Sequence, residues 1–172
     1  MMPSMSIGTT VLRVVVGGMF AGHGAQKLFG WFGGHGPEGT GQFFESSLGL
    51  APGLRQAKTA GAAEFGGGLM LATSLGTPLA AAALSSTMIT AIRKVHLDKG
   101  PWVSEGGYEY NAVILALLFA LTDEDSGLGW AVAQLAAGAA GSWLATGPLN
   151  DEAAGGENGP EAAPPGDPAS TA

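Results

Sequence analysis

Two long stretches without any charged residue constrain the fold of this chain more than any other feature. The first runs from residue 65 to 92 and the second from residue 126 to 150. A helix on the surface of a soluble protein needs charged residues on its exposed face. Only 12% of the whole chain is charged, against roughly 25% in typical soluble domains. We therefore expect helices that lie in a lipid bilayer, with a soluble all-α protein as the alternative.

The net charge and the cysteine count exclude several classes of function. The formal net charge is -7, but much of it comes from five acidic residues in the C-terminal segment: Asp151, Glu152, Glu157, Glu161 and Asp167. No basic surface of the kind that binds nucleic acid is evident, so no nucleic-acid partner is expected. The sequence contains no cysteine, which excludes disulfides, thiol catalysis and thiolate metal ligands.

The pattern of apolar residues and helix breakers predicts an all-α fold, a transmembrane four-helix bundle over residues 1–146. The four predicted spans are residues 7–29, 57–75, 77–97 and 108–122. Residues 130–146 form either a fifth span or an interfacial helix, and an amphipathic segment is expected within residues 33–53. In the third span we expect Thr77 as N-cap and Pro78 at the first helical position. Residues 147–172 are rich in Ala, Gly, Pro and acids, a composition that predicts a disordered tail.

Other sequence features agree with a membrane bundle. Trp31, Trp102 and Tyr108 lie at predicted helix ends, where interfacial aromatic rings are common. Glycines at positions 17, 24, 61 and 68 would let the first two helices approach closely. Residues 1–10 lack the basic segment of a secretory signal, so the first apolar stretch is expected to remain as a helix. Basic residues flank the first and third connections, which places both in the cytoplasm.

Seven residues are candidates for a site inside this bundle. Titratable side chains within a membrane usually face the bundle interior or a wet cavity. The candidate catalytic residues, which would transfer protons, are His23 and Glu64. The candidate ligand-binding residues are Lys27, Arg93, His96, Trp102 and Glu109. The histidines and carboxylates lack the close spacing of a dedicated metal site, so no metal is predicted.

Each candidate also has a structural interpretation. Arg13 and Lys27 could extend to opposite membrane interfaces, with His23 as a satisfied core residue. Glu64 could form an ion pair with Lys27 or with Arg93.

The remaining candidates could act at helix ends. Arg93 and His96 could anchor their helix to lipid headgroups. Glu109 could cap the fourth helix, because an acid in the first turn favours the positive end of the dipole. Trp102 could be an interfacial anchor.

Three blocks of residues resemble the DoxX family of small bacterial membrane proteins. They are His-Gly-Ala-Gln-Lys-Leu-Phe-Gly at 23–30, Glu-Phe-Gly-Gly-Gly-Leu at 64–69, and the Gly-Pro-Trp…Gly-Gly-Tyr-Glu-Tyr-Asn block at 100–111. The resemblance covers roughly residues 9–125, and the family's usual ending after the fourth helix appears here only in an altered form, at residues 125–130. It implies a four-helix membrane bundle in the bacterial plasma membrane. One branch of the family is the small-subunit type of thiosulfate:quinone oxidoreductase.

Together these observations predict a redox-associated membrane subunit that binds a quinone-like or small anionic ligand within the bundle. No covalently bound cofactor is expected; a quinone would be the redox-active ligand. If the chain is an enzyme, the resemblance implies an oxidoreductase subunit of the thiosulfate:quinone type. Its expected partners are the lipid bilayer, a redox partner protein and further copies of itself. A non-catalytic membrane scaffold and a small-solute transporter remain the alternatives.

Overall fold

A computed structural model describes residues 6–147 of the chain, and all regular elements in that range are helices. The six α-helices are α1 Ile7–Phe29, α2 Gly36–Leu48, α3 Gly53–Ala72, α4 Thr77–Ala91, α5 Glu109–Ser126 and α6 Leu128–Thr146. The all-α class predicted from the sequence is confirmed. The predicted tail lies outside the described residues, except for Gly147.

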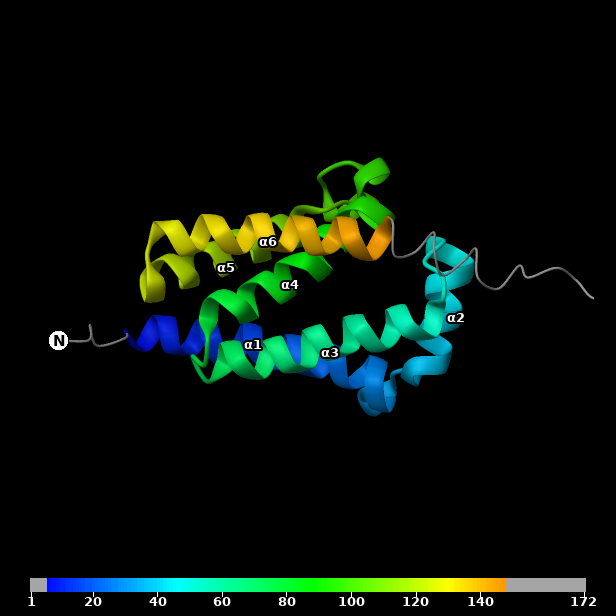
Figure 1. The fold of residues 1–172 in the computed structure, drawn as a ribbon, viewed down its shortest axis with the longest axis horizontal. Helices are drawn as coiled ribbons and strands as arrows, with labels where there is room; N and C mark the ends of the chain where they lie inside the picture. Colours follow the sequence, from blue (N-terminus) through cyan, green and yellow to red (C-terminus); the bar gives the residue numbers. More distant parts are fainter. Residues whose placement is uncertain (1–5, 148–172) are drawn as a thin grey trace, which may run out of the picture.

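The helices form two antiparallel pairs with α4 between them (Figure 1). α1 packs along α3, and α5 packs along α6, while α4 contacts α3, α5 and α6. The short helix α2 lies across the end of the α1–α3 pair and packs against α3. This arrangement places α2, α3, α4 and α6 around the space that contains the larger cavity described below.

α1 and α3 approach each other through glycines on both helices. A Cβ atom on Gly17 would lie 2.5 Å from the carbonyl oxygen of Gly68, and one on Gly24 would lie 2.7 Å from that of Gly61. Any side chain at these positions would therefore push the two helices apart. The close approach predicted from the spacing of these small residues is confirmed.

Both predicted ends are accurate for α1, whereas every other predicted segment is shifted at one end or at both. α1 begins and ends as expected, with Gly30 as its C-cap in the left-handed conformation at φ 69°. α3 begins at Gly53, earlier than predicted, because the Glu45 carboxylate of α2 accepts a 2.8 Å hydrogen bond from the Gly53 N–H. A carboxylate at a helix N-terminus is favoured by the helix dipole.

The start of α4 and the end of α5 also differ from the prediction, because side chains at these ends contact residues far away in the sequence. The N-cap of α4 is Gly76 instead of Thr77, whose hydroxyl donates a 2.5 Å hydrogen bond to Asp125. The three acids at 123–125 form the last turn of α5, where the sequence predicted a turn outside the helix. α4 continues into a π-helical turn, Ile92–His96, and a short 3-10 turn, Leu97–Lys99.

The interior of the bundle is unusually polar and its exterior unusually apolar. Buried polar side chains include Arg13, Glu64, Ser85, Thr122 and Gln134. Large apolar side chains are exposed on every α-helix, among them Val14, Val15, Met19, Phe43, Leu69, Leu79, Val113, Trp130 and Trp143.

Among the helices of residues 6–147, none combines the length and the hydropathy that crossing a bilayer requires.

Candidate functional site

A buried ion pair between Lys27 and Glu64 is the centre of the candidate site. The Lys27 Nζ lies 2.5 Å from Glu64 Oε2, and the two side chains are 21% and 8% exposed. The residues are 37 positions apart in the sequence and meet because the glycine contacts bring α1 against α3. The ion pair is the structural interpretation proposed for Glu64, and it is confirmed with Lys27 as the partner.

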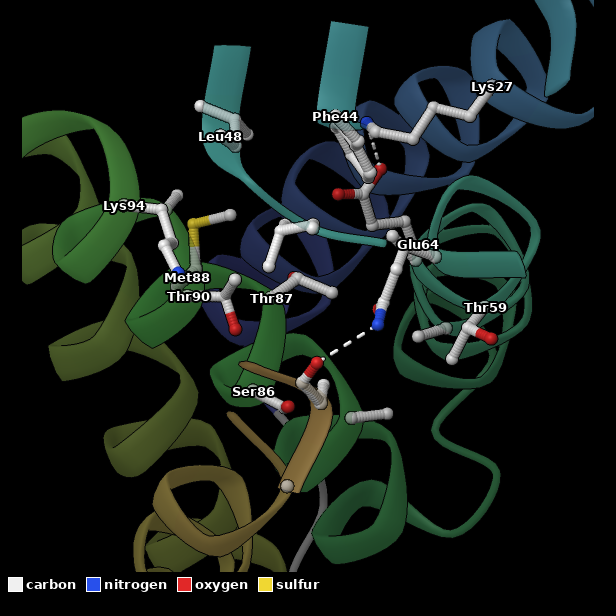
Figure 2. Close-up of a pocket in the computed structure, with 18 of the residues that line it drawn as sticks. Lys27, Phe44, Leu48, Thr59, Glu64, Ser86, Thr87, Met88, Thr90 and Lys94 are labelled. Carbon is white, nitrogen blue, oxygen red and sulfur yellow. Dashed lines mark hydrogen bonds and ion pairs between the residues drawn. The ribbon is translucent and has the colours of Figure 1, made fainter. Parts of the chain in front are cut away.

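The first cavity at this ion pair, called the apolar cavity, has a volume of about 480 Å³. Phe44 and Leu48 of α2, alanines of α3, α4 and α6, and Met88 of α4 line it. Figure 2 shows Lys27 and Glu64 joined at one side, with Thr90 of α4 and Lys94 of the π-helical turn on another. The Gln56 amide spans from α3 to α6, where it donates a 3.0 Å hydrogen bond to the Ala145 carbonyl.

A second cavity of about 440 Å³, called the histidine cavity, also reaches the Lys27–Glu64 pair. Its lining includes His23, His96, Tyr110 and Asn111. Lys27, Glu64 and Met88 line both cavities. The ion pair therefore stands at the boundary between an apolar chamber and a chamber with titratable side chains.

The hydrogen bonds of the two histidines indicate which ring atoms remain available. His96 Nδ1 lies 2.6 Å from the Gly106 carbonyl oxygen. Because a carbonyl can only accept, Nδ1 donates this hydrogen bond, and Nε2 is the ring nitrogen that remains available to another partner. His23 Nδ1 lies 3.1 Å from Gln26 Oε1, and the residue is exposed. The interpretation of His23 as a satisfied core residue is therefore wrong.

The structure brings together four of the seven candidates and separates the other three. His23, Lys27, Glu64 and His96 line the histidine cavity. Arg93 instead donates to Ser142 at 3.2 Å and to Thr146 at 2.9 Å, both on α6. Trp102 is 65% exposed, and Glu109 is the first residue of α5. Neither residue lines either cavity.

The π-helical turn explains why Arg93 and His96 do not share one site. A π-helical turn contains more residues than an α-helical turn and so rotates the side chains that follow. Arg93 therefore points to α6, and His96 points into the histidine cavity. The regular helical spacing used for the prediction cannot reveal this change.

Lys94 and Arg13 are charged residues that the sequence interpretation missed or misplaced. Lys94 lines the apolar cavity, and no sequence signal distinguished it from its neighbour Arg93. Arg13 is only 1% exposed and pairs with Asp125 at 2.7 Å. The expectation that Arg13 extends to a membrane interface is therefore wrong.

Within residues 6–147 no three His, Asp or Glu side chains cluster closely enough to hold a metal ion.

The comparison with known families covers the helices that build this site. Residues 8–97, more than half of the chain, match the DoxX family. The chain belongs to the DoxX family. The matched part of this DoxX chain extends from α1 through the π-helical turn and includes the Lys27–Glu64 pair and Lys94.

A curated protein supports the same membership. "Putative oxidoreductase CatD" of Bacillus subtilis (strain 168) is 34% identical over 119 residues, which are 69% of this DoxX chain and 81% of that protein. No solved structure matches the chain.

Proposed function

We propose that this DoxX-family chain is a membrane-embedded bundle that binds a quinone-like ligand in the apolar cavity. In this proposal it is the membrane subunit of a redox system in the bacterial plasma membrane. The Lys27–Glu64 pair at the wall of the apolar cavity is the observation that carries the ligand-binding part.

The membrane part of the proposal is supported by the outer surface of the assembled bundle. Soluble monomers rarely expose large contiguous apolar patches, yet Val11, Val14, Val15 and Met19 of α1 are each more than half exposed. α1 has 23 residues, about 34 Å at ~1.5 Å per residue, close to the roughly 30 Å of a bilayer core. Since no single helix of residues 6–147 has the length and hydropathy of a membrane span, the support comes from the combined exterior of the bundle.

The ligand part is supported by the size and chemistry of the apolar cavity. Its volume of about 480 Å³ falls within the roughly 300–1,000 Å³ of small-molecule sites. The walls are mostly apolar and suit a planar ring. The Lys27 ammonium can donate a hydrogen bond to a quinone oxygen, because it carries three donors and Glu64 accepts only one.

The redox part is supported by the name of the Bacillus subtilis relative, "Putative oxidoreductase CatD". A quinone supplies the chemistry of taking up two electrons and two protons to become a hydroquinone. In this proposal Glu64 holds a proton at the cavity wall, and the support is that His23 and His96 line the adjoining histidine cavity. Because the chain contains no cysteine, we propose that a redox partner protein delivers the electrons.

Binding of para-naphthoquinone to the protein purified in dodecyl maltoside tests this function. Lys27→Met should weaken binding about tenfold or more, because a hydrogen bond from a charged group contributes about 1.5–3 kcal/mol. Lys58→Met is the matched control, since Lys58 is an exposed residue of α3 outside both cavities. Absence of binding to the wild type would refute the ligand site and favour the scaffold alternative. Mass spectrometry of small molecules that copurify would identify the natural ligand.

A further inference from the structure

Lys94 is a cation at the wall of the apolar cavity. It is half-buried, belongs to the π-helical turn after α4, and lines the cavity directly. Across residues 6–147, no carboxylate lies within ion-pair distance of its ammonium group. The buried cation Arg13 and the partly buried Lys27 both have a carboxylate partner. Lys94 therefore differs from the other cations of the bundle interior.

The charges around the apolar cavity do not balance. Its charged lining residues are Lys27, Glu64 and Lys94. The first two neutralise each other in their ion pair, which leaves one positive charge. An unpaired charge next to apolar walls is costly, and a bound anion would remove part of this cost. In Figure 2 Lys94 extends from the π-helical turn on one side of the view, and Lys27 enters from α1 on the other.

We propose that the apolar cavity selects an amphiphile that carries one negatively charged oxygen, with Lys94 as its counter-ion. The apolar walls hold the body of the ligand, and Lys94 binds the anionic group. This inference rests on the proposed function and narrows its ligand to an ionised form, such as a ring bearing an enolate or phenolate oxygen. The same chemistry is offered by an anionic lipid, whose acyl chain is apolar and whose headgroup carries the charge.

A matched pair of ring compounds tests the charge selectivity. Para-naphthoquinone is neutral, whereas lawsone, its hydroxy derivative, is ionised at neutral pH. In dodecyl maltoside, which adds no charge of its own, the wild type should bind lawsone about ten- to hundredfold more tightly, as expected for a charge-assisted contact. Lys94→Met should abolish this preference, so that lawsone binds no more tightly than naphthoquinone. Lys94→Arg should keep the preference, and the exposed control Lys58→Met should alter neither affinity.

The outcomes separate this inference from the proposed function. If the wild type binds neither compound, both proposals fail. If it binds the two compounds equally, or if Lys94→Met keeps the preference for lawsone, the role of Lys94 is refuted while the ligand site stands. Because the wild-type comparison needs no variant, misfolding of Lys94→Met would not block the test. Displacement of lawsone by phosphatidylglycerol would assign the site to a lipid, and failure to displace it would assign a free small molecule.

Discussion

Arg13 of α1 and Asp125 of α5 form an ion pair at the end of the bundle far from Lys27. Arg13 Nη2 lies 2.7 Å from Asp125 Oδ1, and a second guanidinium nitrogen donates to Thr77 of α4 at 3.2 Å. Asp125 belongs to the last turn of α5, where a negative charge is disfavoured by the helix dipole. The buried guanidinium offsets this effect and joins three helices at one point.

Removal of Arg13 should destabilise the bundle strongly. Arg13→Met leaves Asp125 without its partner, and breaking a buried pair costs about 3–5 kcal/mol in the free energy of unfolding. Chemical denaturation in detergent, followed by circular dichroism, measures this change. The double variant Arg13→Met with Asp125→Asn should recover part of the loss, and Arg55→Met on the exposed surface should change stability little. Equal stability of Arg13→Met and wild type would contradict a structural role for the pair.

Neighbouring glycines of α1 should respond oppositely to the same substitution. Gly17→Ala places a Cβ atom 2.5 Å from the Gly68 carbonyl oxygen, whereas within residues 6–147 a Cβ atom on Gly18 would meet no heavy atom within 4 Å outside the backbone of its own helix. Overpacking of this kind costs about 1–3 kcal/mol, so Gly17→Ala should lower the unfolding midpoint. Gly18→Ala should leave it unchanged or raise it, because alanine favours the helix by about 1 kcal/mol over glycine. Similar effects of the two changes would argue against the α1–α3 contact.

If the bundle lies in a membrane, the protein should stay in the membrane fraction when cells are fractionated. The full-length chain should remain with bacterial membranes through an alkaline carbonate wash and should enter solution only with detergent. Val15, which is 52% exposed, provides a matched test. Val15→Lys should reduce insertion, because a lysine at the centre of a membrane helix costs about 2.5–3.5 kcal/mol, and Val15→Leu should not. Recovery of the wild type as a dissolved monomer after ultracentrifugation without detergent would refute the membrane proposal.

Two adjacent alanines of α3 can locate the ligand. Ala63 lines the apolar cavity, and Ala62 is exposed and lines neither cavity. Ala63→Phe should fill part of the cavity and weaken the binding of naphthoquinone and lawsone together. Ala62→Phe adds the same ring outside the cavity and should leave both affinities unchanged. Normal binding by Ala63→Phe would place the ligand elsewhere, with the histidine cavity as the next candidate.

Glu64→Gln separates a proton-transfer role from a binding role. Loss of a positioned acid–base group typically lowers a rate about 10²–10⁴-fold. Quinone reduction by membranes that contain the variant, with thiosulfate as the electron donor, should therefore fall while naphthoquinone binding persists. His23→Ala tests the second candidate in the same assay, and the exposed Glu105→Gln is the control. Wild-type rates in both Glu64→Gln and His23→Ala would favour the scaffold alternative.

The sequence predicted which segments are helical, and it located the ends of α1 because the signals there come from nearby residues. α1 ends where Gly30 adopts a left-handed conformation, and that signal is local. The glycine spacing also predicted the α1–α3 contact, since positions 17 and 24 lie on one face of a helix. The sequence left two possible ion-pair partners for Glu64, namely Lys27 and Arg93. The choice between them depends on how far the helices are shifted along their axes relative to one another, which the sequence does not reveal.

The sequence by itself therefore determined the all-α class, the approximate helices and the scarcity of charge that makes each buried ion important. The tertiary structure alone decided which ions meet. In the packed bundle Arg13 points inward and pairs with Asp125, Arg93 contacts α6, and Lys94 lines the apolar cavity. The physical reason is that helix formation is governed by hydrogen bonds only a few residues apart, whereas the partner of a side chain depends on how whole helices pack. A single π-helical turn changes that outcome without leaving a signal in the local sequence.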